Sequence, residues 1–413
     1  MLLNKILKVL KKYRFQLVLF IFGLFFSILT VDVYLRITED KSSDGGQCSS
    51  LDKYFHNVMI PNTVCRQISD EWDVEFSINN LGIRDEDLSF YKPDDEYRLV
   101  LLGDSFTQGH GVELEDRYST IIEKRFNENN PNVNINIINL AIFGHSPLTQ
   151  YLYLKKVGLL FNPDLMMYAF TITDFFDDNK RFEELIFSYP DLGEDAILAK
   201  IESGQVEFDF EKINKSAAIE KNQEIEKSKT VYLIKKWLRE NIRIYKFTIN
   251  FIKNTVRDEK ENQSLTGDID HDIYSIIRGD DISEDDWQKL WKIPITNLVN
   301  MKKLLEEKNI PFVVIAIPDA IQVSSKEWPG RTLISVDENF SDTREPFEYE
   351  LTERLNSHDI PTINLLPGFK QSGKFPLYFS QDYHWNKTGH ELAAEIIYNY
   401  LLNAGYFKLK TSE

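Results

Sequence analysis

The spacing of apolar positions changes repeatedly from residue 98 onward. Continuous apolar runs of strand length occupy 98–105, 133–144, 164–173, 311–318 and 361–367. Segments with helical spacing of apolar positions follow them, at 117–129, 146–161, 295–309, 346–358 and 386–405. Apolar strands that alternate with helices are typical of a parallel sheet covered on both faces. The pattern therefore predicts an α/β fold with a doubly wound, mostly parallel sheet.

One long insertion, at about 180–290, interrupts this alternation. It contains a hairpin-like stretch that turns at Ser203-Gly204, a helical stretch at 227–242 and an acidic stretch. Insertions at the carboxyl end of a strand often shape a binding site. Acidic residues alternate from Asp268 as in a calcium loop, but Ile273 stands where Gly is needed and Gly279 where Glu is needed. We therefore predict a solvated acidic loop without a metal.

The N-terminus has a different pattern. Residues 4–14 are cationic, and residues 15–31 are apolar and uncharged, a marginal length against the about 20 residues of a membrane helix. A cleaved signal peptide is the alternative, but bulky residues at 31–36 stand where cleavage needs small ones. We predict a cytoplasmic basic tip and a transmembrane signal anchor over 1–36. By the positive-inside rule, the rest of this single-pass membrane protein is then extracytoplasmic, in the periplasm or at the cell exterior.

The remaining chain divides by composition. Residues 37–75 begin with a polar, Gly/Ser-rich stretch and predict a stalk or linker, and 76–413 form the main domain with its insertion. The net charge of −17 argues against a nucleic-acid partner, because phosphate binding needs clustered Lys and Arg. Cys48 and Cys65 could close a small loop in an oxidising compartment or remain two free thiols.

Candidate chemistry begins in "LLGDSFTQGHGV" (101–112), where Ser105 follows the first strand of the predicted sheet. Ligands bind beyond the carboxyl ends of strands in open α/β sheets, so this is a suitable place for a nucleophile. A serine hydroxyl needs a base within hydrogen-bond reach and an acid that orients the base. His384, with Asp382 two residues before it, supplies both in an extended loop. Helix capping by the same two residues is an equally weighted alternative.

The other histidines near these motifs have different expected roles. His110 and His145 lie on loops near the predicted site, and we expect them in the pocket wall rather than as bases. His390 lies inside the last predicted helix, where packing or surface exposure is expected.

"GDSFTQG" (103–109) followed far downstream by "DYHW" (382–385) resembles the SGNH, or GDSL-type, hydrolase family, over most of residues 76–403. The resemblance implies a three-layer α/β/α, flavodoxin-like fold and serine esterase chemistry without a metal or organic cofactor. Ser105 would be the nucleophile, His384 the general base and then acid, and Asp382 the residue that orients the imidazole.

The resemblance also implies an oxyanion hole. Its donors would be the backbone N–H of Ser105, the backbone N–H of Gly144 after the second strand, and an asparagine after the third. Here Thr173 occupies the asparagine position, and Asn179 is a nearby alternative. Loss of one oxyanion donor typically costs about 3 kcal/mol, or ~100-fold in rate.

Three functional hypotheses are compatible with these residues. The favoured one is an anchored, extracytoplasmic ester hydrolase that removes acyl groups, most plausibly acetyl, from a glycan or cell-envelope substrate. The second is an O-acyltransferase in polysaccharide modification, which would use the same site. The third, motivated by Thr173, is a glycan-binding protein that keeps the fold without the chemistry.

Overall fold

The computed structural model describes residues 48–69, 71–130, 134–216, 284–324, 327, 347–380 and 382–407, with four single positions nearer the N-terminus (15, 22, 23 and 30). Chain contacts divide the protein into two units, residues 1–41 with 218–265 and residues 42–217 with 266–413. Apart from those four positions, the described residues all belong to the second unit.

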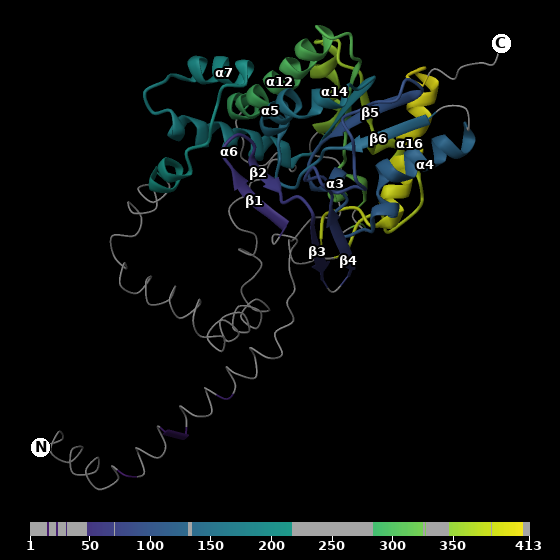
Figure 1. The fold of residues 1–413 in the computed structure, drawn as a ribbon, viewed down its shortest axis with the longest axis horizontal. Helices are drawn as coiled ribbons and strands as arrows, with labels where there is room; N and C mark the ends of the chain where they lie inside the picture. Colours follow the sequence, from purple (N-terminus) through teal and green to yellow (C-terminus); the bar gives the residue numbers. More distant parts are fainter. Residues whose placement is uncertain are drawn as a thin grey trace, which may run out of the picture. The chain divides into compact units, whose positions relative to one another are not determined.

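A five-stranded parallel sheet forms the centre of this unit (Figure 1). Its strands are β5 (Glu96–Leu102), β6 (Asn134–Asn139), β7 (Leu165–Phe170), β8 (Phe312–Ala316) and β9 (Thr362–Asn364), in the order β6-β5-β7-β8-β9. Every residue of β7 and β8 is buried, as continuous apolar runs predict. The parallel α/β sheet expected from the sequence is therefore confirmed.

Helices cover both faces of the sheet. On one face α4 (Tyr118–Asn129), α13 (Ala320–Val323), α15 (Leu366–Gln371) and α16 (Lys387–Asn403) pack with Leu99 and Leu101 of β5. On the other, α5 (Pro147–Lys156), α6 (Thr173–Ser188), α7 (Glu194–Ser203), α12 (Glu284–Glu306) and α14 (Phe347–Asn356) pack with Val100 and Leu102. Alternate residues of one strand thus enter two separate cores. The first core, on the side of α5 and α6, contains Val100 and Leu102, and the second core, on the side of α4 and α16, contains Leu99 and Leu101.

The order of connections reverses at β5, because β6 lies on one side of it and β7 on the other. The carboxyl ends of β5 and β7 flank this switch point, where open α/β sheets bind ligands. A single helical turn, α3 (Ser105–Gln108), follows β5 directly. Two 3-10 segments, Leu114–Asp116 and Gly158–Phe161, complete the short elements around the sheet.

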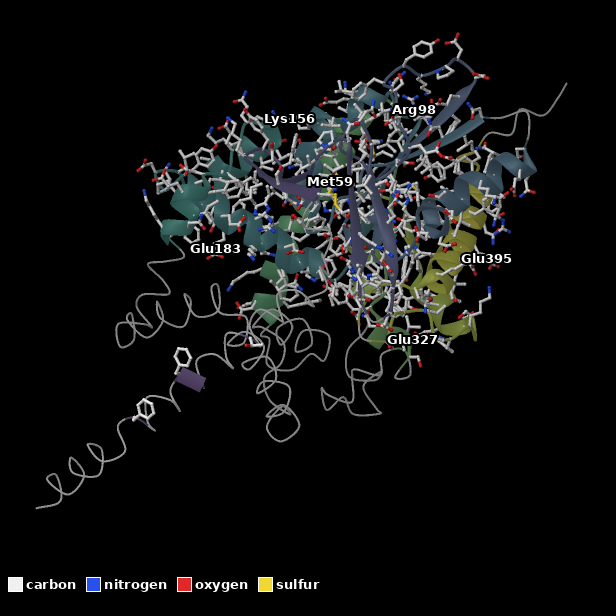
Figure 2. All side chains as sticks on the ribbon, turned by 60° about the horizontal axis from the view of Figure 1, so that its bottom comes forward. Met59, Arg98, Lys156, Glu183, Glu327 and Glu395 are labelled. Carbon is white, nitrogen blue, oxygen red and sulfur yellow. A yellow bond between two sulfur atoms is a disulfide. The ribbon has the colours of Figure 1, made fainter. Side chains whose placement is uncertain are left out.

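Two antiparallel hairpins precede the sheet, β1 (Ser49–Asp52) with β2 (His56–Met59) and β3 (Thr63–Ile68) with β4 (Asp73–Ile78). We expected a stalk or linker over 37–75, whereas the described part of that segment folds onto the domain. Burial alternates along β4, and Met59 of β2, 2% exposed, points into the middle of the domain (Figure 2). A disulfide joins Cys48 to Cys65, and both residues are buried in the first core.

The described part of the insertion also differs from the expectation. Ser203 ends helix α7 and Gly204 caps it in the left-handed conformation with φ +74°, so no hairpin turns there. The helix forms because Ile197 and Ile201, one turn apart, bury the same face. The stretches 227–242 and 268–279 lie outside the described residues.

The predicted membrane anchor falls almost entirely outside the described residues. Within the residues that the structure describes, no helix has the length and apolar character needed to cross a bilayer. The anchor over 1–36 therefore stays a prediction from the sequence.

Candidate active site

The turn after β5 presents Ser105 at the carboxyl edge of the sheet. Gly103 has φ +156°, and a Cβ there would lie 2.6 Å from Thr107 Oγ1, so the turn requires glycine. Asp104 then caps α3, because its Oδ1 accepts a hydrogen bond from the Phe106 N–H at 3.0 Å. These two residues place Ser105 at the first position of the helix.

Ser105, His384 and Asp382 form a continuous hydrogen-bonded chain. Ser105 Oγ lies 2.7 Å from His384 Nε2, and His384 Nδ1 lies 2.5 Å from Asp382 Oδ1. The same carboxylate oxygen accepts the backbone N–H of His384 at 2.7 Å. An ionised carboxylate only accepts, so Nδ1 carries the hydrogen and Nε2 is free to accept the serine proton. The structure thus brings together the three residues that the motifs single out.

Electrostatic interactions keep the Asp382 carboxylate ionised. Burial acts to raise the pKa of Asp382, but the hydrogen bonds and charge of His384 and the nearby His110 outweigh it and lower that pKa to about 2. The carboxylate can therefore stabilise an imidazolium at His384.

Helix capping is performed by a different residue. Asn386 caps α16, since its Oδ1 accepts the Gly389 N–H at 3.1 Å. Asp382 and His384 lie before this cap, in a loop held by the Phe379 N–H, which donates to the His384 carbonyl at 3.0 Å. Buried Trp385 follows His384 and anchors the loop in the second core.

Two backbone N–H groups at the site are available to an oxyanion. Within the described part of the chain, the N–H groups of Ser105 and Gly144 make no hydrogen bond. Gly144, with φ +67°, lies in the loop after β6, which is tied to the serine turn because the Ile142 N–H donates to the Gly103 carbonyl at 3.2 Å. Unpaired N–H groups near a nucleophile are the donors that acyl transfer needs.

The predicted third donor, Thr173, is engaged elsewhere. Thr173 Oγ1 lies 2.8 Å from Thr171 Oγ1, and the Thr171 hydroxyl donates to Asp104 Oδ2 at 2.9 Å. While Asp104 is ionised, Thr171 has no second hydrogen, so Thr173 must donate to Thr171. Asn179 is not an alternative, because its amide donates to the carbonyls of Phe175 and Leu290.

The histidines predicted as pocket-wall or packing residues have distinct surroundings. His145 is buried between the Asn57 carbonyl and the Gln150 amide, and burial lowers its pKa to about 3. His390 is also buried, and its Nδ1 accepts the Tyr118 N–H at 3.4 Å. His110 lies at the site itself, since its ring centroid is 4.4 Å from that of His384.

Two supporting residues were not singled out by the sequence. The buried Arg84 guanidinium donates to the carbonyls of Gln108, Gly109 and Val112, and so holds the loop that follows α3. Gln67 occupies an inward position of β3, where its Oε1 accepts the Gly111 N–H at 3.1 Å. A polar residue in the buried register of a strand was the available signal for Gln67, whereas a lone Arg in a loop gave none for Arg84.

By residue type, His110, Asp382 and His384 could hold a metal, since their ligand atoms lie within 4.8 Å of one another. The hydrogen bonding disfavours this use. Gln67 Oε1 faces the Gly111 N–H, so the Gln67 amide nitrogen faces His110 Nδ1, at 3.4 Å. Nδ1 must then accept, which leaves the hydrogen of neutral His110 on Nε2, toward Asp382. A protonated nitrogen is a donor, not a ligand.

The lowered pKa of Asp382 gives a stability prediction. An unfolded Asp has a pKa near 3.9. Ionised Asp382 therefore stabilises the fold above pH about 4, and this contribution is lost as the pH falls toward 2. The deficit in unfolding free energy of Asp382→Asn relative to wild type should be roughly 2 kcal/mol larger at pH 6 than at pH 2, measured by urea unfolding. A deficit that does not change with pH would contradict it.

A family model matches part of this chain. Residues 288–412 match the family model described as SGNH hydrolase-like domain, acetyltransferase AlgX, a range that includes Asp382 and His384. No curated protein matches the sequence.

Solved structures with a similar chain path include two esterases. A catalytic mutant of the acetylxylan esterase Axe2 from Geobacillus stearothermophilus has 11% identity and a TM-score of 0.37, over 77% of this chain and 97% of that one. The psychrotrophic esterase EstA from Pseudoalteromonas sp. has 11% identity and a TM-score of 0.34, over 74% of this chain and 97% of that one. The match over residues 288–412, together with the parallel α/β sheet and the two motifs, supports an SGNH hydrolase-like domain in this chain.

Proposed function

We propose that this protein is a serine ester hydrolase that removes acyl groups, acetyl foremost, from a glycan or cell-envelope substrate. The observation that carries the proposal is the hydrogen-bonded chain from Ser105 through His384 to Asp382. The match to a family described by an acetyltransferase supports a small acyl group. The glycan or cell-envelope substrate is inferred from the predicted location outside the cell membrane.

The geometry supports a two-step reaction. Ser105 Oγ attacks the acyl carbonyl while its proton passes to His384 Nε2, and Asp382 stabilises the resulting imidazolium. The N–H groups of Ser105 and Gly144 receive the oxyanion. His384 then returns the proton to the leaving sugar oxygen as the ester bond breaks. Water, deprotonated by the same Nε2, attacks the acyl-serine. The bond to Ser105 Oγ breaks, His384 returns the proton to Oγ, and the carboxylic acid is released.

Loss of the nucleophile tests this proposal. The purified protein should hydrolyse p-nitrophenyl acetate and become labelled by a fluorophosphonate at Ser105. Ser105→Ala should lose the labelling and at least ~1000-fold of kcat/KM, since removal of a triad member leaves only binding and oxyanion stabilisation. Equal rates for the two proteins, or no label on folded wild type, would contradict the proposal and favour a non-catalytic glycan-binding role.

Acyl transfer is the second candidate, and the acetyltransferase in the family description favours it. A sugar hydroxyl would then replace water as the acceptor of the acyl-serine. Addition of an oligosaccharide to the hydrolysis assay separates the two: acetylated oligosaccharide in excess over free acetate indicates a transferase, and free acetate alone a hydrolase.

The role of Thr173 can be tested in the same assay. Because its hydroxyl donates to Thr171 while Asp104 is ionised, Thr173→Val should lower kcat/KM by less than about threefold, against ~100-fold for a true oxyanion donor. Ser105→Ala, which removes the nucleophile, is the comparison in the same assay and should show the large loss. A loss near ~100-fold in Thr173→Val would restore the threonine as the third donor.

We also propose that residues 1–36 anchor the protein in a membrane with the SGNH domain outside the cytoplasm. The Cys48–Cys65 disulfide supports an oxidising compartment. In acid-quenched cells that make the full chain, both cysteines should resist alkylation until a reductant is added, and the protein should sediment with membranes. Freely alkylated cysteines, or protein in the supernatant, would contradict the proposal.

A further inference from the structure

The β3–β4 hairpin, residues 63–78, is built against the loop that carries Asp382 and His384. Glu71 accepts hydrogen bonds from the backbone N–H of Ser380 at 2.6 Å and from its hydroxyl at 2.5 Å. The Trp72 ring packs on Phe379, with centroids 4.5 Å apart. The hairpin therefore holds the start of this catalytic loop.

A second set of contacts joins the hairpin to His110. Gln67 is 5% exposed, and its two amide atoms have different partners, the Gly111 N–H and His110 Nδ1. A backbone N–H can only donate, so the orientation of the Gln67 amide is determined, and with it the tautomer of His110. Trp72 contacts the edge of the same imidazole at a centroid distance of 5.2 Å.

His110 in turn faces both members of the acid–base pair. Its ring lies 4.4 Å from the His384 ring at an interplanar angle of 34°. Its Nε2 lies 3.9 Å from Asp382 Oδ2, the oxygen that His384 does not use. At this distance the N–H acts on the carboxylate as an oriented dipole rather than as a direct hydrogen bond.

The charges around His110 favour its neutral form. Burial, followed by the charge of His384, lowers the pKa of His110 to about 4, with a further contribution from Arg84 and opposition from Asp382. A neutral ring does not compete with the His384 imidazolium for the carboxylate. Protonation of His110 would place a second cation beside it and oppose proton transfer from Ser105.

We propose that His110 is a positioning residue for the Asp382–His384 pair, and that Gln67 of the hairpin sets the tautomer in which it does so. Gln67 then acts on the acid–base pair through His110, although it precedes the residues matched by the family motifs. This inference rests on the proposed hydrolase function.

Two substitutions of His110 isolate the N–H that faces Asp382. In His110→Gln the amide nitrogen reaches about as far as Nε2, whereas in His110→Asn it reaches only about as far as Nδ1. Both remove the ring, so their difference reports the donor. We expect kcat/KM of His110→Asn to be about tenfold below that of His110→Gln, with the loss in kcat and KM unchanged within about twofold. Equal values in the two folded variants would overturn the proposal.

Gln67→Glu tests the tautomer. The new side chain keeps an acceptor for the Gly111 N–H but faces His110 Nδ1 with a second acceptor and a negative charge. The pKa of His110 should rise, so the imidazolium persists to higher pH and the acid limb of the kcat/KM profile should move upward by about one pH unit. Val64→Thr, an exposed position on the same strand, is the control and should leave the profile unchanged. An unchanged acid limb in folded Gln67→Glu would overturn the proposal.

A measurement that does not need turnover separates this inference from the proposed function. The proton between His384 Nδ1 and Asp382 gives a downfield NMR resonance, which should broaden or shift in His110→Asn but not in Val64→Thr. If wild type fails to hydrolyse esters, the proposed function fails, while this resonance still decides the positioning role. An unperturbed resonance in folded His110→Asn would overturn that role.

Discussion

The chemistry that the site can perform depends on one hydrogen bond, the 2.7 Å contact between Ser105 and His384, whose partners are 279 residues apart. A glycine turn at the end of β5 positions Ser105, and a loop before the last helix positions His384. Both loops rest on the second core, which α4 and α16 form with one face of the sheet. The packing of that core therefore decides whether the two side chains meet, because the contact itself contributes little to folding.

Much of this arrangement was predictable from periodicity and motif spacing. Continuous apolar runs predict buried parallel strands, and the turn "GDS" after the first of them predicts where a hydroxyl would be presented. The separation of Asp382 from His384 was sufficient to propose a carboxylate on Nδ1. The same spacing could not distinguish a catalytic carboxylate from a helix-capping one, because both lie just before a helix. The structure distinguishes them, because Asn386 caps the helix through the Gly389 N–H.

Other features could not be predicted because they depend on contacts between distant segments. The hydrogen of Thr173 is directed by Thr171 and Asp104, which follow different strands. The polar stretch at 37–56 and the residues after it gave no strong strand signal. The hairpins found there are stabilised by docking on the domain and by the Cys48–Cys65 bond. Arg84 donates hydrogen bonds to backbone carbonyls. Because every residue has a backbone carbonyl, the sequence does not indicate which ones Arg84 binds.

The position of Asp382 two residues before His384 has a consequence for how such a site loses its geometry. A single carboxylate oxygen holds both the main chain and the ring of the histidine, so acid and base form one short covalent unit. Partial opening of the domain would leave the Asp382–His384 contact intact and lengthen only the distance between His384 Nε2 and Ser105 Oγ. Heat inactivation would then begin when the loop at 382–385 separates from Ser105, and return of that loop would restore a preassembled pair of acid and base.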